Sequence, residues 1–207
     1  MKRISAAVLL VGLGLGSSAF GDTLIFVPPA GDLGSPTWTY TLDGVNVVAT
    51  GFNGGDLWGK NLGSTEEGIG LANDPSGQHE IFVGKGTAIP FIQLNMSSLL
   101  SHGFTGFEFE MNSTQGREVW QVSACPTAST LCSNAQTLTG TNQILDKVPS
   151  NFGSADPYLD FSMATGATTG NVLLAAIAAS SVPEPATLAL LGLGLAGLGL
   201  TRRRRSS

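Results

Sequence analysis

Carboxylate and amide side chains gather in one glycine-rich stretch of the chain, from Gly51 to Glu80. They are Asp56, Glu66, Glu67, Asn73, Asp74 and Glu80. Hard oxygen ligands on adaptable loops suit Ca²⁺, which takes about six to eight of them at once. The spacing does not match an EF-hand loop. Two interpretations stay open: a solvated acidic loop that needs no cofactor, or a Ca²⁺ site formed by Asp56, Glu66, Glu67, Asp74 and Glu80.

The same carboxylates have the chemistry of a glycan hydrolase, which needs an acid and a base about 5–9 Å apart across a sugar. Spacing along the chain does not give that distance. His79 and His102 are the chain's only histidines, and the sequence has no GxSxG, HExxH or P-loop motif. We therefore expect no enzymatic activity and keep glycan hydrolysis as an alternative.

Cys125 and Cys132 are the only cysteines. Outside the cytoplasm such a pair forms a disulfide. Closing so short a loop stabilises the fold by about 2–3 kcal/mol at most. The alternative is a redox or metal-binding pair, although no third or fourth ligand follows with a suitable spacing.

Three tryptophans, Trp38, Trp58 and Trp120, can stack on sugar rings where they are exposed. In a domain of this size aromatic side chains more often belong to the core. Exposed tryptophans beside a Ca²⁺-stiffened loop would make a Ca²⁺-dependent carbohydrate-binding module, a second alternative for the function.

The residues that position these groups follow β-strand patterns. Thr37–Leu42 alternates, Asp43-Gly44 follows, and Val45–Ala49 continues, which predicts a hairpin. Phe107, Phe109 and Met111 lie on one face of a further strand, with Glu108 and Glu110 on the other. The remaining predicted strands are Asp22–Val27, His79–Val83, Phe91–Asn95, Glu118–Ala124, Tyr158–Met163 and Val172–Ala178.

The segments between these strands read as turns and loops. Gly51–Gly77 is predicted mainly as loop, Ser97–Leu100 as a helical turn, and Pro126–Thr141 as loop with a short strand. Val172–Ala178 is continuously apolar and fits a central buried strand. Residues 22–181 therefore predict one all-β domain, a β-sandwich or jelly roll.

The N-terminus has the pattern of a secretory signal peptide, residues 1–19. Met1-Lys2-Arg3 is basic, Ile4–Leu15 is apolar, and Ser17-Ser18-Ala19 presents small residues to signal peptidase. We expect Sec export with cleavage after Ala19, and Ala19-Phe20-Gly21 is an alternative site. A retained N-terminal anchor is the other interpretation.

Three different segments adjoin at the C-terminus, within residues 182–206. Val182-Pro183-Glu184-Pro185 precedes an uncharged run, Ala186–Leu200, which would be about 22 Å long as a helix. With Thr201 it predicts a short transmembrane helix, residues 186–201. Arg202, Arg203, Arg204 and Arg205 then stop transfer and stay cytoplasmic. A buried core helix or a nucleic-acid patch are the weaker alternatives.

This tail resembles the PEP-CTERM sorting signal of Gram-negative bacteria. The resemblance implies recognition by an exosortase and processing near the motif Val182, Pro183, Glu184 and Pro185. It implies a precursor anchored in the inner membrane with a periplasmic ectodomain. It also implies delivery to the cell surface or extracellular matrix, in association with exopolysaccharide.

A second resemblance covers residues 57–122. Leu57-Trp58-Gly59-Lys60, Phe91-Ile92-Gln93-Leu94-Asn95 and Gly116-Arg117-Glu118-Val119-Trp120 are similar to a recurrent ectodomain of PEP-CTERM proteins. That pattern often has Gly-Leu-Gly where this chain has Gly68-Ile69-Gly70. It implies a secreted β-sandwich and supplies no catalytic residues.

Charge separates the domain from its ends. Residues 22–181 hold four basic and 14 acidic residues, a formal charge of −10. Such a surface repels nucleic acid and anionic lipid. We expect a secreted, non-enzymatic surface protein associated with the polysaccharide matrix and no nucleic-acid partner.

Overall fold

A computed structural model describes residues 22–63, 66–84, 88–114, 118–139 and 145–181. Its strands, with one short helix, are β1 (Asp22–Ile25), β2 (Gly31–Asp32), β3 (Thr37–Leu42), β4 (Val45–Phe52), β5 (Leu57–Asn61), β6 (Glu67–Leu71), β7 (Ile81–Phe82), β8 (Phe91–Asn95), α1 (Ser97–Ser101), β9 (Phe104–Asn112), β10 (Val119–Cys125), β11 (Gln136–Thr139), β12 (Asp146–Lys147), β13 (Tyr158–Met163) and β14 (Asn171–Ser181).

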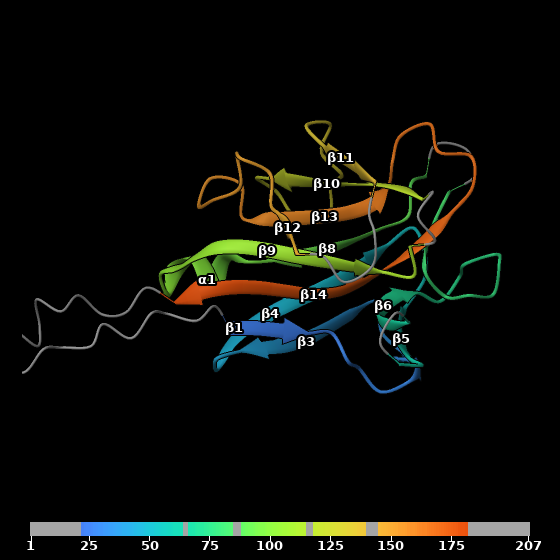
Figure 1. The fold of residues 1–207 in the computed structure, drawn as a ribbon, viewed down its shortest axis with the longest axis horizontal. Helices are drawn as coiled ribbons and strands as arrows, with labels where there is room; N and C mark the ends of the chain where they lie inside the picture. Colours follow the sequence, from blue (N-terminus) through green and yellow to red (C-terminus); the bar gives the residue numbers. More distant parts are fainter. Residues whose placement is uncertain (1–21, 64–65, 85–87, 115–117, 140–144, 182–207) are drawn as a thin grey trace, which may run out of the picture.

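Two antiparallel sheets pack face to face as a sandwich, which confirms the predicted fold class (Figure 1). The first sheet has the order β12-β9-β14-β6-β5-β2, and β1 and β7 also pair with β14. The second has the order β11-β10-β13-β8-β4-β3. Strands far apart in sequence pair within each sheet. β9 pairs with β14 in the first sheet, and β4 pairs with β8 in the second.

β14 is the central strand of the first sheet, as its continuous apolar run predicts. Along one edge it pairs with β9, and along the other it meets β7, then β6, then β1. Residues Val172–Ala179 are all buried, since both faces and both edges of the strand are covered.

The predicted hairpin is confirmed at Asp43-Gly44. Asp43 has φ 48° and Gly44 has φ 78°, the left-handed pair that a two-residue hairpin loop requires. Leu42 pairs with Val45, and the register continues to Thr37 with Thr50.

Aromatic side chains from both sheets fill the core. Phe109 on β9 packs edge-on against Trp120 and Phe161 of the other sheet, at centroid distances of 5.5 and 5.1 Å. Phe107 and Met111 are buried beside it, which confirms the predicted inner face of that strand. Trp120 is 1 % exposed and is therefore a core residue with no access to a sugar.

The prediction of loop for Gly51–Gly77 is wrong in two places, because β5 and β6 lie within it. Leu57, Ile69 and Leu71 are fully buried, so these short apolar groups are strand residues. Glycine allows two backbone segments to lie very close together here. A Cβ on Gly70 would lie 2.1 Å from the carbonyl oxygen of His79, so only glycine lets the 72–80 segment lie against β6.

We expect Gly70→Ala to lower the free energy of unfolding by about 1–3 kcal/mol, because the added methyl group must push the 72–80 segment away. Chemical denaturation of wild type and variant measures it. Gly153→Ala is the matched control, since nothing lies within 4 Å of its added Cβ. An equal effect of the two substitutions would contradict the role of Gly70 in this close packing.

The two ends of the described domain lie side by side, because Asp22 pairs with Ala179 (Figure 1). The predicted signal peptide and the predicted C-terminal helix would thus join the sandwich at one end. Both fall outside the described residues. Within the described ranges, no helix is long and apolar enough to span a membrane.

Candidate functional site

An ammonium group lies between two of the predicted acidic residues. Lys60, on β5, contacts Oε2 of Glu66 and Oε1 of Glu80 through Nζ. Lys60 is 8 % exposed and Glu80 2 %. The Ser113 hydroxyl lies 2.8 Å from Oε1 of Glu80 and 3.0 Å from Oε1 of Glu66, and its single proton serves both. These four side chains are called the Lys60 cluster below.

Charge compensation decides the ionisation of this cluster. Burial by itself lowers the pKa of Lys60, but hydrogen bonds and charges from Glu66 and Glu80 outweigh burial and raise it, so the ammonium stays charged. Burial raises the pKa of Glu80, and hydrogen bonds from Lys60 and Ser113 offset part of that rise. Lys60 therefore neutralises a carboxylate that would otherwise be buried without an opposite charge.

The five acidic residues proposed for Ca²⁺ do not come together. Only Glu66 and Glu80 lie together, and the ammonium group of Lys60 contacts both of them. Asp74 accepts hydrogen bonds from the backbone N–H and the hydroxyl of Ser76, at 2.9 and 2.7 Å. Glu67 borders a separate pocket of about 300 Å³, and Asp56 is half-buried before β5.

In the part of the chain that the structure describes, no three of the five bring carboxylate oxygens within 4.8 Å of one another. The Ca²⁺ site stays a prediction with a direct test. Because Lys60 supplies the positive charge between Glu66 and Glu80, we expect Ca²⁺ added after chelation to leave the Tm unchanged. A rise in Tm in differential scanning calorimetry would contradict this expectation and support a Ca²⁺ site.

Trp58 and His79 form a stacked pair next to the Lys60 cluster. Their ring centroids are 3.7 Å apart and their planes meet at 14°. Nδ1 of His79 lies 3.0 Å from the carbonyl oxygen of Ala72. The imidazole therefore covers one face of the indole and is itself held by backbone. Trp58 is half-buried, as is Trp38.

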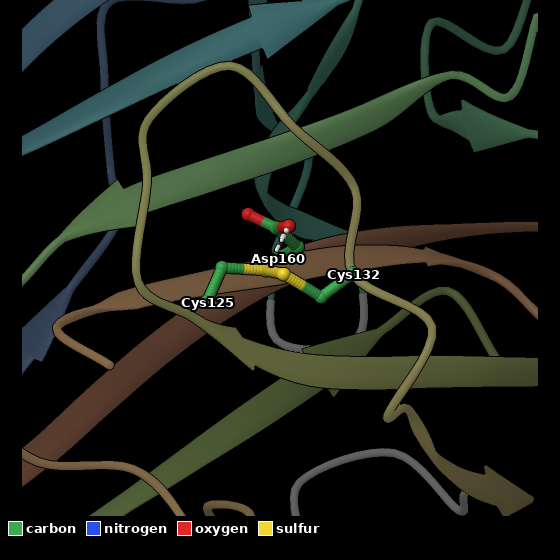
Figure 2. A group of neighbouring side chains, drawn as sticks. All are labelled: Cys125, Cys132 and Asp160. Carbon is green, nitrogen blue, oxygen red and sulfur yellow. Dashed lines mark hydrogen bonds between the residues drawn. A yellow bond between two sulfur atoms is a disulfide. The ribbon is translucent and has the colours of Figure 1, made fainter. Parts of the chain in front are cut away.

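The two cysteines form the predicted disulfide, which confirms that pairing (Figure 2). Cys125 ends β10 and is fully buried, and Cys132 lies half-buried in the loop that follows. Their Cα atoms are 5.8 Å apart, a normal separation for a disulfide. The loop they close lies over part of the outer face of the second sheet, at β8 and β13.

A buried carboxyl group lies against this disulfide. Asp160 is fully buried on β13, and its Oδ2 is 2.8 Å from Sγ of Cys125. Oδ1 accepts a hydrogen bond from Nε2 of Gln93 at 2.7 Å, and the backbone N–H of Cys132 donates to the carboxyl group. Burial raises the pKa of Asp160 to about 7, despite these two hydrogen bonds, which lower it.

A disulfide sulfur carries no hydrogen, so only the carboxyl group of Asp160 could supply a proton to the contact with Cys125. Two sulfur atoms and a carboxylate oxygen lie within 4.8 Å of one another (Figure 2). The sulfur atoms are bonded to each other, so the group is a disulfide in contact with a buried carboxyl group.

Lys60, Ser113, Gln93 and Asp160 were not among the residues predicted from the sequence. Asp160 left one signal, since it stands alone as a charge within the apolar pattern Tyr158–Met163. Lys60 and Ser113 left none, because their partners Glu66 and Glu80 lie in other segments, just before β6 and β7.

Comparison with known protein families identifies the C-terminal residues as a sorting motif. A family model described as the PEP-CTERM protein-sorting motif matches residues 181–205. The chain carries a PEP-CTERM sorting motif. No curated protein and no solved structure matches the chain.

The PEP-CTERM motif implies an exported cell-surface protein that an exosortase processes. The resemblance of residues 57–122 to a recurrent PEP-CTERM ectodomain stays a prediction, since the match covers the tail alone. The motif itself, Val182, Pro183, Glu184 and Pro185, lies outside the described residues. So do Ala19 and the basic residues Arg202, Arg203, Arg204 and Arg205.

We expect replacement of Pro183, Glu184 and Pro185 by alanine to abolish processing, since these residues form the recognition motif. Intact-mass spectrometry of the exported protein would then find the full tail, with its four arginines. Cells that lack the exosortase, expressing the wild-type chain, are the matched control and should give the same precursor. Loss of the tail from the triple variant would contradict the prediction.

Proposed function

We propose that residues 22–181 act as a non-enzymatic surface protein that contacts the exopolysaccharide matrix, after exosortase processing of the PEP-CTERM tail. The sorting motif carries this proposal, because it implies export to the cell surface. The association with exopolysaccharide follows from the resemblance of the tail to PEP-CTERM sorting signals. The formal charge of −10 in this segment favours neutral or cation-bridged glycans over anionic partners.

The acidic residues support a structural role over a hydrolytic one. Glu66 and Glu80 both contact Lys60, and Ser113 hydrogen-bonds to both. A general acid and a general base must exchange protons with a sugar and a water held between them. Here the ammonium of Lys60, and not a sugar or a water, lies between the two carboxylates.

A shallow pocket on the second sheet has the chemistry to contact a sugar. Its volume is about 200 Å³. Its lining combines aromatic, amide and hydroxyl side chains, namely Phe52, Tyr158, Asn95, Thr50 and Ser129. Aromatic rings stack on sugar faces, and amide and hydroxyl groups hydrogen-bond to sugar hydroxyls.

A pull-down with exopolysaccharide from the producing bacterium tests this function. The processed ectodomain should be retained, and Tyr158→Ala or Thr50→Ala should weaken retention on the order of tenfold, equivalent to about 1.4 kcal/mol. Thr41→Ala is the control, because Thr41 is exposed on β3 outside the pocket. No retention of the wild-type domain would overturn the proposal, and equal retention of all variants would remove the pocket from it.

A further inference from the structure

A fully buried carboxyl group, that of Asp160, lies against the disulfide. A disulfide that only stabilises the fold does not need one. Leu159, Phe161 and Met163 of β13 point into the core, so Asp160 points to the opposite face. On that face Asp160 is fully buried, with the loop from Cys125 to Cys132 lying beside it (Figure 2). A buried carboxyl group costs free energy that an apolar residue of similar size would not. The carboxyl therefore calls for a chemical explanation beyond packing.

The two sulfur atoms are inequivalent. Cys125 is at the end of a strand, fully buried, and within 2.8 Å of Oδ2 of Asp160. Cys132 lies in the covering loop and is partly exposed. An incoming thiolate reaches Cys132 first, and the electron pair of the broken bond then falls on the buried sulfur. A thiolate at Cys125 would be costly there without a proton donor.

Hydrogen bonds hold the donor in place. Gln93 donates through Nε2 to Oδ1 of Asp160 and accepts through Oε1 from the backbone N–H of Ser129, at 3.1 Å. Asp160 also accepts from the backbone N–H of Cys132. The carboxyl group is thereby fixed to both the sheet and the loop, and its Oδ2 is left directed at Sγ of Cys125 (Figure 2).

We propose that Cys125–Cys132 is a thiol–disulfide exchange site, at which a thiolate attacks Cys132 and Asp160 protonates Cys125. The thiolate sulfur forms a bond to Sγ of Cys132, and the bond between Cys132 and Cys125 breaks. Sγ of Cys125 takes the electron pair and receives the proton from Oδ2 of Asp160. The products are a mixed disulfide at Cys132, a thiol at Cys125 and a carboxylate at Asp160.

The reverse step uses the same groups. The carboxylate of Asp160 accepts the proton of Cys125, whose thiolate attacks Cys132 and releases the original thiolate. A second thiolate can instead attack the reductant's sulfur in the mixed disulfide. Cys132 then leaves as a thiolate, which completes a two-electron reduction of the protein, and the two reductant thiols end as a disulfide. The groups that face Asp160 are Gln93 from β8, Ser123 from β10 and Cys132 from the loop, and none of them is charged. Tyr158 lies two residues away on the same face of β13.

Reduction of the folded full-length protein, exported and purified in detergent, tests the proposal. The probe is dithiothreitol, and alkylation followed by mass spectrometry measures the rate from pH 6 to 9. Corrected for the thiolate fraction of the probe, the wild-type rate should fall at least about tenfold above pH 7, because Asp160 loses its proton. Asp160→Asn should be slower at pH 6.5 and show a flat profile. Asp43→Asn, in an exposed turn, should behave as wild type.

Two further variants test the order of attack. With glutathione disulfide as probe, Cys125→Ser should form a mixed disulfide at Cys132 at least about tenfold faster than Cys132→Ser forms one at Cys125. Equal rates for the two variants would overturn the proposal. So would a wild-type reduction rate that equals the rate of global unfolding at every pH. The wild-type profile needs no variant, so the test stands even if Asp160→Asn does not fold.

Discussion

Replacement of Lys60 by methionine should lower the free energy of unfolding by about 3–5 kcal/mol, the cost of breaking a buried ion pair by removing one partner. Methionine keeps most of the side-chain volume, so the loss comes from charge. Glu80, 2 % exposed, would then be buried with Glu66 as a like charge beside it. At about 2–4 °C per kcal/mol for a domain of this size, the Tm should fall by about 6–20 °C.

The same substitution at an exposed site is the control. Lys147 lies exposed on β12, and Lys147→Met should change the Tm by no more than about 2 °C. Addition of Glu80→Gln to Lys60→Met should recover part of the loss, since it removes the buried uncompensated charge. If Lys60→Met were as mild as Lys147→Met, the ionic account of the cluster would fail.

Stability should decrease between pH 5 and pH 8 because of Asp160. Its pKa is about 7 in the folded protein, against an ordinary value of 3.8, so the folded state holds the proton over a range in which the unfolded chain has lost it. This contribution is therefore present at low pH and is lost as pH rises through 7. From pH 5 to pH 8 it amounts to about 2–3 kcal/mol, or about 5–10 °C in Tm.

Asp160→Asn separates this effect from the others. Burial also raises the pKa values of Glu80, Glu110 and Asp146, which contribute a dependence of the same sign. The difference between wild type and Asp160→Asn, measured by thermal denaturation at each pH, isolates Asp160. The two curves should converge near pH 4, separate between about pH 4 and pH 7, and keep a constant gap above pH 8, where the variant is more stable. Parallel curves would show that Asp160 does not titrate in this range.

Patterns local in the sequence predicted much of the fold. Alternation at Thr37–Leu42 and the Asp43-Gly44 pair predicted a hairpin whose strands and left-handed turn are observed. The apolar run at Val172–Ala178 predicted a buried central strand, and β14 is one. These signals work because strand period and turn conformation depend on a few neighbouring residues. β5 and β6 were missed because glycines broke the apolar pattern, although those glycines serve close packing.

The sequence alone determined the sorting of this protein to the cell surface and its fold class. The PEP-CTERM motif and the predicted signal peptide are linear segments that processing enzymes recognise by residue order. The tertiary structure alone decided which acids are neutralised, since Lys60 on β5 meets Glu66, Glu80 and Ser113 from three loops. It alone placed Asp160 against Cys125, 35 residues away in the chain. Strand register and burial set such contacts, and residue spacing along the chain encodes neither.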